Sequence, residues 1–168
     1  MPLSMYQASV PVFLRMLTNL TNVLDKAMAH VAARKLESAA LLNARLYPDM
    51  FPLVRQVQLA TDFAKNTSAR LAGVELPKFD DTETSFEELK ARIARATEFL
   101  KALKPSQIDG TEEKEITYLI AGQPTTFKGQ QYLFNSGLAN FYFHVTTAYA
   151  ILRHNGVELG KRDFLGPY

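Results

Sequence analysis

The sequence predicts an all-α fold, a four-helix bundle with crossover connections and a small β-hairpin between helices three and four. Three observations lead to this prediction. Apolar residues recur at helical spacing in four long segments. A single stretch between them has the β-branched and aromatic runs typical of short strands. The length of 168 residues is enough for one domain with a full-sized core, which we place at residues 1–168.

The composition is that of an ordinary globular protein and excludes several functional classes. Hydrophobic residues make up 47% of the chain and charged residues 21%. The 19 basic and 17 acidic residues leave a net charge of +2, and basic runs are short, so we expect no nucleic-acid partner. The chain has no cysteine, which rules out disulfides and thiolate chemistry. Without a signal peptide or a membrane-length apolar run, the sequence predicts a cytoplasmic protein with no membrane contact.

The first two long helices are each predicted to begin near a proline. The first is placed over residues 4–33, where leucines recur at helical spacing. Pro11 predicts either a kink in this helix or its true first turn, with Ser9 as the cap. After a connector with a short helix, Asp49 is predicted to cap the second long helix, which ends at Gly73.

A polar linker over residues 74–84 leads to the third helix, residues 85–104. Ser85 and Glu88 have the spacing of a capping box, which predicts the start of this helix. Arg92 lies away from the apolar stripe of the helix, so its side chain is expected in solvent.

Residues 115–120 and 125–128 are short strand-like runs around an Ala-Gly-Gln-Pro segment, and they predict the hairpin. The fourth helix is placed over residues 130–155, with Phe134 on its core face and an Asn-Gly pair at its end. The connectors between helices one and two and between three and four are long. Their length favours crossover connections over a simple up-and-down series.

One edge of the apolar face of the fourth helix is polar. At about 100° per residue, Asn140 and His144 fall on one line with Gly137. The other two histidines, His30 and His154, lie near helix C-termini, where the helix dipole favours a cation. His144 is therefore the candidate functional histidine. The alternative is a buried histidine that is hydrogen-bonded to Asn140 or to another helix.

A pocket at His144 would use the imidazole as a metal ligand or as an acid and base. One histidine does not hold a transition metal alone, so partners would come from Asn140, a glutamine of the second helix or Asp62. Amides are weak ligands for zinc or nickel. Asp62 has an alternative role as an interhelical charge near Lys65 or Arg55.

Two stretches carry a resemblance to a known family: RQVQLATDFAK at residues 55–65 and FYFHVTTAYAILRHNGVELGKRDFLG at residues 141–166. Through them the chain resembles the DinB-like (YfiT-like) superfamily of bacterial four-helix bundles, and within it an uncharacterised branch. The resemblance covers nearly the whole chain and implies the same fold as the helical pattern.

Typical members of this superfamily have three metal-binding histidines, one on helix two and two in an HxxxH pair ahead of a Leu-Arg-x-x-Gly ending. Residues 152–156 match that ending, and counting back places His144 on the second histidine of the pair and Asn140 on the first. The helix-two position falls at Gln58, by the Gln-Leu-Ala string, or at Gln56, which the helical wheel turns inward. On either alignment, two of the three ligands are replaced by amides.

The resemblance implies a small-molecule-binding pocket with a degenerate metal site, and with either no cofactor or a divalent metal such as zinc or nickel. Two alternatives remain: a metal-dependent transferase of the DinB/YfiT type, and a homodimeric structural or interaction module. The aromatic run at residues 141–143 covers several sides of its helix, which indicates either core packing or an oligomer interface. Core packing is the first interpretation of this run, and a homodimer is the expected partner if the run forms an interface. Whether the protein is an enzyme is left open. The pocket candidates are His144, Asn140, Gln56, Gln58 and Asp62, with His144 as the metal candidate.

Overall fold

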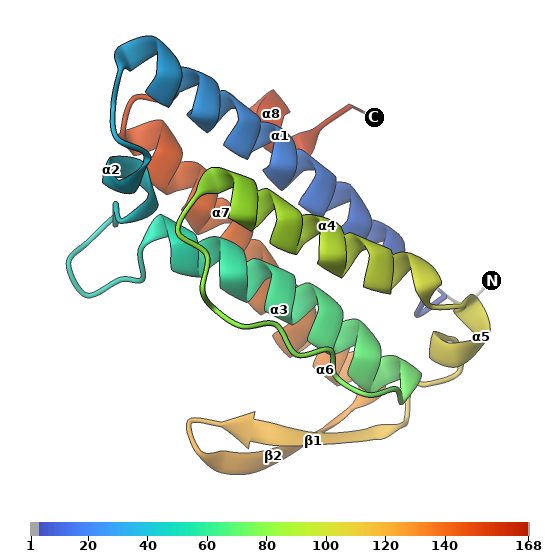
Figure 1. Cartoon of the computed structure of the whole chain (residues 1–168). Coiled ribbons are helices and arrows are strands. Elements are labelled where there is room, and N and C mark those ends of the chain that lie inside the picture. The colour runs from blue at the N-terminus through green and yellow to red at the C-terminus, as the bar shows by residue number, and fades with distance from the viewer. Residues whose placement is uncertain (1–3, 168) are drawn as a thin grey trace.

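The computed structural model describes residues 4–167, which form mainly helices and one two-stranded sheet (Figure 1). The four long helices are α1 (Val10–Arg34), α3 (Leu53–Ala72), α4 (Phe86–Ala102) and α7 (Ala139–His154). The short helices are α2 (Ser38–Leu42), α5 (Pro105–Ile108), α6 (Gly129–Tyr132) and α8 (Lys161–Leu165). No helix within this range combines the length and the apolar character that a membrane span requires.

The long helices lie side by side around an apolar core. α3 packs between α7 and α4, and α1 packs against α4 and α7. In Figure 1, α1 and α7 run in one direction while α3 and α4 run in the other. Phe13 on α1 meets Phe141 on α7 edge to face, with 4.9 Å between the ring centroids. This fully buried pair joins the first long helix to the last.

The connection between α3 and α4 is the one that crosses the molecule. Because these two helices are consecutive and parallel, residues 73–85 return along the whole length of α3 (Figure 1). An extended chain covers about 3.3 Å per residue and a helix rises only about 1.5 Å, so a short linker is enough. The long connections that the sequence suggested as crossovers, from α1 to α3 and from α4 to α7, instead join helices that run in opposite directions.

Two helix starts differ from the sequence prediction because a proline sets each of them. α1 begins with Pro11 in its first turn and Ser9 at the cap position, so the predicted start at residue 4 is wrong and the alternative is correct. At α3, Pro52 takes the cap position predicted for Asp49, with an extended backbone (φ −70°, ψ 167°). Proline suits a helix start because the first N–H groups have no partner within the helix.

The predicted capping box at Ser85 and the predicted hairpin are both confirmed. The Ser85 hydroxyl accepts a hydrogen bond from the Glu88 N–H at 3.1 Å, and the Glu88 carboxylate accepts one from the Ser85 N–H at 3.2 Å. The hairpin forms from β1 (Glu115–Ile120) and β2 (Gln123–Lys128), which pair antiparallel. Residues 121–122 both have positive φ, 48° and 80°, as the tight turn between twisted strands requires.

The fourth helix is continuous but not regular. α6 passes into α7 through η1 (Leu133–Leu138), a π-helical segment with wider turns than an α-helix. The wider turns rotate the preceding residues relative to the predicted face, and Phe134, expected in the core, is 40% exposed. Gly137 lies so close to α3 that an added Cβ would be 2.5 Å from Thr67 Cγ2. The missing side chain therefore lets η1 lie directly against α3.

Arg92 on α4 departs furthest from the sequence prediction. Its side chain, expected in solvent, is fully buried. Nε donates to the Thr61 hydroxyl at 2.8 Å, and Nη2 pairs with the Asp62 carboxylate at 2.8 Å. Arg92 therefore joins α4 to α3, which a helical wheel of α4 alone does not show.

The same guanidinium also makes hydrogen bonds and ion pairs with the linker between α3 and α4. Nη1 donates to the Asp80 carbonyl at 3.0 Å and pairs with Glu83 at 3.1 Å. Nη2 pairs with Asp81 at 3.0 Å. The guanidinium carbon also lies 5.4 Å from the ring centroid of Phe79. We call Arg92 and these four linker residues the linker clamp.

Replacing Arg92 with Met is expected to lower the free energy of unfolding by about 3–5 kcal/mol, because three carboxylates, one of them buried, lose their buried partner. Glu83, whose side chain is 5% exposed, would be left most isolated. Urea unfolding at pH 7 measures the change. Arg95→Met is the matched control: its side chain is 56% exposed, and we expect a loss below about 1 kcal/mol. Equal losses in the two variants would contradict a stabilising role for the linker clamp.

Candidate functional site

The structure brings together two of the predicted site residues, Gln56 on α3 and His144 on α7. His144 Nδ1 lies 2.8 Å from Gln56 Oε1. The amide orientation follows from its other contact, since Gln56 Nε2 donates to the Phe51 carbonyl at 3.0 Å. Because Oε1 can only accept, Nδ1 of the imidazole carries the proton and donates it. The lone pair of the neutral ring is then on Nε2.

Aromatic side chains surround the His144 ring, which is 7% exposed. Phe63 stacks on it at 5.5 Å between centroids, with 18° between the planes. Phe143 meets it edge to face at 5.3 Å. Within residues 4–167, Thr67 Oγ1 is the only fully buried polar side-chain atom without a hydrogen-bond partner. His144 Nε2, which makes no hydrogen bond there, is therefore not sealed from solvent.

His144 is neutral at physiological pH. Burial, and then the positive charge of Arg55, lower the pKa of His144 from 6.5 to about 4. A neutral imidazole with Nδ1 protonated offers one hydrogen-bond acceptor at Nε2. It is a weak base at pH 7.

The other predicted residues point elsewhere. Asn140 turns back onto its own helix, where Nδ2 donates to the Ser136 carbonyl at 2.8 Å. Gln58 Nε2 donates to Glu83 at 2.8 Å, so this glutamine belongs with the linker. Of the two helix-two glutamines, Gln56 is the one that faces His144.

Asp62 makes ion pairs, as in the alternative interpretation of its sequence position. It pairs with Lys65 of its own helix at 3.1 Å and with Arg92 of α4 at 2.8 Å. Arg55, the other partner predicted for it, pairs with Asp81 instead. The contacts of Asp62 place its carboxylate beside the linker clamp, and within residues 4–167 it makes no hydrogen bond or ion pair with His144.

The donors near His144 do not fit a zinc or nickel ion. Such sites take three or four histidine, cysteine or carboxylate ligands, and residues 4–167 contain no group of three such side chains that could hold a metal. Gln56 Oε1 already accepts a hydrogen bond from His144, and the Asn140 amide donates a hydrogen bond to the backbone of its own helix. The arrangement instead presents one hydrogen-bond acceptor.

A second polar cluster, which sequence reasoning missed, lies where α3 meets η1 and the hairpin. Arg70 donates to the Tyr132 hydroxyl at 3.1 Å and lies over the Tyr118 ring at 4.9 Å. The Tyr118 hydroxyl is hydrogen-bonded to Ser136. Burial raises the pKa of Tyr132. Each tyrosine alone fits a core position in the sequence, and no spacing rule connects the four residues, so no local signal identifies this cluster.

Comparison with known proteins agrees with the resemblance noted in the sequence. A family model described as "Domain of unknown function (DUF1993)" matches residues 5–165. The crystal structure of a DinB family member protein from Shewanella denitrificans is 41% identical and superposes with a TM-score of 0.92, covering 97% of this chain and 92% of that one. No curated protein matches the chain. The chain therefore belongs to the DUF1993 family and is a DinB-like protein.

Proposed function

We propose that this protein binds a small, largely apolar molecule that donates one hydrogen bond, and that His144 Nε2 accepts this bond without a metal. The observation that carries the proposal is the hydrogen-bond chain from the Phe51 carbonyl through Gln56 to His144 Nδ1. These hydrogen bonds orient the ring and leave Nε2 as an unpaired acceptor.

We also propose that α1, α3, α4 and α7 form the predicted four-helix bundle, with the site on facing helices.

The surroundings of His144 define the character of the ligand. Phe143, which contacts the edge of the imidazole, is 56% exposed. Phe51, whose carbonyl begins the hydrogen-bond chain, has a side chain that is 54% exposed. A ligand with an aromatic ring and a single hydroxyl or N–H group would match these rings and the single acceptor.

Binding suits this geometry better than catalysis. A general base works best when its pKa lies near the operating pH, whereas the pKa of His144 is about 4. A metal-dependent transferase would need further donors, and the amides of Gln56 and Asn140 are engaged elsewhere. We therefore favour a binding protein over the transferase alternative.

Phenol and its methyl ether, anisole, test the acceptor because only phenol carries a hydroxyl donor. We expect phenol to shift the NMR signals of the His144 ring, and anisole to bind about tenfold more weakly, because one hydrogen bond is lost. Titrations of the two probes at pH 7 give both affinities.

Two variants make this measurement specific. His144→Phe keeps an aromatic ring but removes Nε2, and it should bind the two probes equally. His154→Phe, at the exposed end of α7, is the matched control and should keep the preference for phenol. A preference for phenol that survives His144→Phe would contradict the proposal.

The lowered pKa of His144 makes stability depend on pH. The folded-state pKa of about 4 lies below the ordinary 6.5, so between these values the unfolded chain binds a proton that the folded chain does not. The stability from neutral His144 is present above pH 6.5 and is lost as the pH falls towards 4. At pH 5 the loss amounts to about 2 kcal/mol. Urea unfolding gives the free energy of unfolding at pH 7 and at pH 5. This free energy should fall less between the two pH values for His144→Phe than for the wild-type protein. An equal fall in both proteins would contradict the assignment.

A second function is favoured by the aromatic outer surface of the fourth helix. Phe134, Tyr142 and Phe143 are 40%, 37% and 56% exposed. Large exposed apolar side chains of this kind mark interaction sites. We propose that this surface supports a homodimer, as the sequence also predicts.

Sedimentation equilibrium tests the dimer. Phe134→Ser should weaken self-association by about tenfold or more, because an aromatic contact leaves the interface. Tyr47→Ser is the matched control, since Tyr47 is 67% exposed on the connector before α3. A wild-type protein that stays monomeric at high concentration would exclude the dimer.

A further inference from the structure

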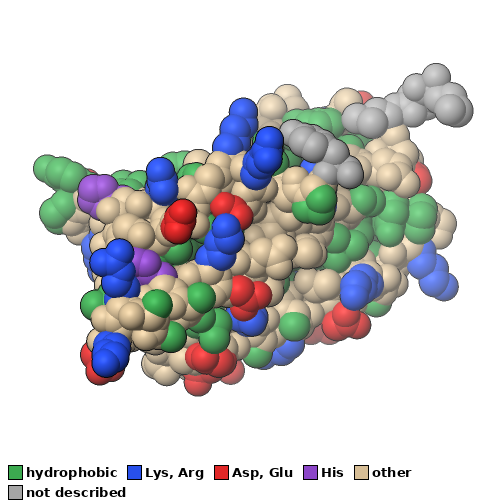
Figure 2. Space-filling model, turned by 90° about the horizontal axis from the view of Figure 1, so that it is seen from above, with side chains coloured by type: hydrophobic (Ala, Val, Ile, Leu, Met, Phe, Trp, Pro, Cys, Tyr) green, Lys and Arg blue, Asp and Glu red, His purple; other side chains and the backbone are tan. Residues whose placement is uncertain are grey.

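A groove of about 1080 Å³ lies at the end of the molecule where α1 and α7 both end, and it lies apart from His144. Lys26, His30 and Arg34 line it from α1, and Arg153 lines it from α7. Glu158 and Asp163 complete the charged lining from the chain that follows α7. In Figure 2, the histidine side chains on the visible face lie at one end of the molecule, among Lys and Arg side chains.

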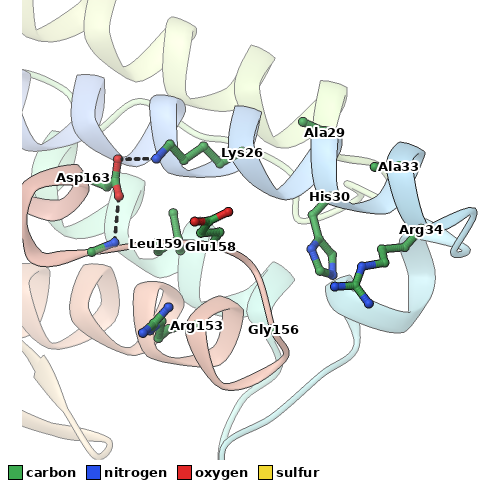
Figure 3. Close-up of a pocket in the computed structure, with 11 residues that line it drawn as sticks. Lys26, Ala29, His30, Ala33, Arg34, Arg153, Gly156, Glu158, Leu159 and Asp163 are labelled. Atoms are coloured by element: carbon green, nitrogen blue, oxygen red, sulfur yellow. Dashed lines mark hydrogen bonds and ion pairs between the residues drawn. The ribbon is translucent and has the colours of Figure 1, made fainter.

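On one wall of the groove, the positive and negative side chains are paired with one another. Lys26 Nζ pairs with Asp163 at 2.8 Å. The other carboxylate oxygen of Asp163 accepts a hydrogen bond from the Gly160 N–H at 2.7 Å. Figure 3 shows the pair of Lys26 and Asp163, which joins α1 to α8. Lys26 and Asp163 therefore cancel one another, and the remaining charges decide what the groove attracts.

The remaining charges are mostly positive and are not neutralised by the protein. Within residues 4–167, Arg34, Arg153 and His30 have no ion-pair or hydrogen-bond partner through their side chains, and neither has Glu158. In Figure 3, His30 and Arg34 lie beside one another on α1, and Arg153 projects from α7 on the other side of the groove. Two guanidinium groups and an imidazole thus face a space that contains one carboxylate.

Stabilisation of the helix ends explains only part of this arrangement. Basic residues in a last turn interact favourably with the helix dipole, and Arg34 and Arg153 occupy the last turns of α1 and α7. That effect requires no shared groove, and it leaves the guanidinium donors of both arginines without hydrogen-bond partners in the described part of the chain. A bound anion would supply these partners, and guanidinium groups suit carboxylate and phosphate oxygens because they form paired hydrogen bonds.

We propose that this groove binds a small organic dianion, with phosphoryl or carboxylate groups held by Arg34 and His30 on one side and by Arg153 on the other. The volume is that of a site for a metabolite-sized molecule. Glu158 repels such a ligand and limits its affinity. The groove is a second binding site, chemically unlike the neutral acceptor at His144.

Isothermal titration calorimetry with pyrophosphate and with citrate, at low salt and pH 7, tests the proposal on the full chain. The two probes separate phosphoryl from carboxylate chemistry. Arg34→Gln and Arg153→Gln should each weaken binding of the preferred probe by about tenfold, because a charge-assisted contact is lost. Glu158→Gln should strengthen binding, because the like charge is removed.

Lys78→Gln is the matched control, since it also removes one exposed positive charge but lies in the linker, away from the groove. It should leave the affinity unchanged within about twofold. The altered side chains are exposed, and circular dichroism checks that each variant is folded. If neither probe binds, or if the two arginine variants bind like Lys78→Gln, the groove is not an anion site.

Discussion

The rest of the arrangement depends on the buried guanidinium of Arg92. A guanidinium group taken out of water is stable only when its donors are matched, and Arg92 finds its partners on α3 and on the linker together. The linker therefore follows α3 closely, which allows α3 and α4 to lie parallel. α3 also packs against α7, and there Gln56 meets His144.

Arg55 connects the linker to the candidate site. Its guanidinium pairs with Asp81 of the linker clamp and donates to Gln58 at 3.2 Å. These contacts hold a positive charge close enough to His144 to lower its pKa further, in addition to the effect of burial. The polarity of the site is thus set partly by the linker. A rearrangement of the linker that moved Arg55 away would raise the pKa of His144, while burial would still lower it.

Sequence patterns predict the structural features that depend on neighbouring residues. They do not predict contacts between residues that are distant in the sequence. The capping box at Ser85 and the hairpin are local, and both form. A helical wheel places Arg92 in solvent because it does not include the linker that covers it. It places Phe134 in the core because it assumes α-helical spacing, which the π-helical segment breaks. The wheel does turn Gln56 inward, but the Phe51 carbonyl that orients its amide comes from a loop, which no periodicity describes.

The Gln56 amide gives this site a chemistry that differs from that of a metal site. A metal site needs lone pairs that converge on one point. Here the Nδ1–H of His144 points at Gln56 Oε1, and the remaining lone pair of the ring points away from it. An amide suits this role because it both donates and accepts, so it joins the Phe51 carbonyl to the imidazole. A carboxylate in its place would favour the imidazolium ion and remove the acceptor. The amide, the burial of the ring and the nearby Arg55 all favour the same neutral state, and that state suits the recognition of a hydrogen-bond donor.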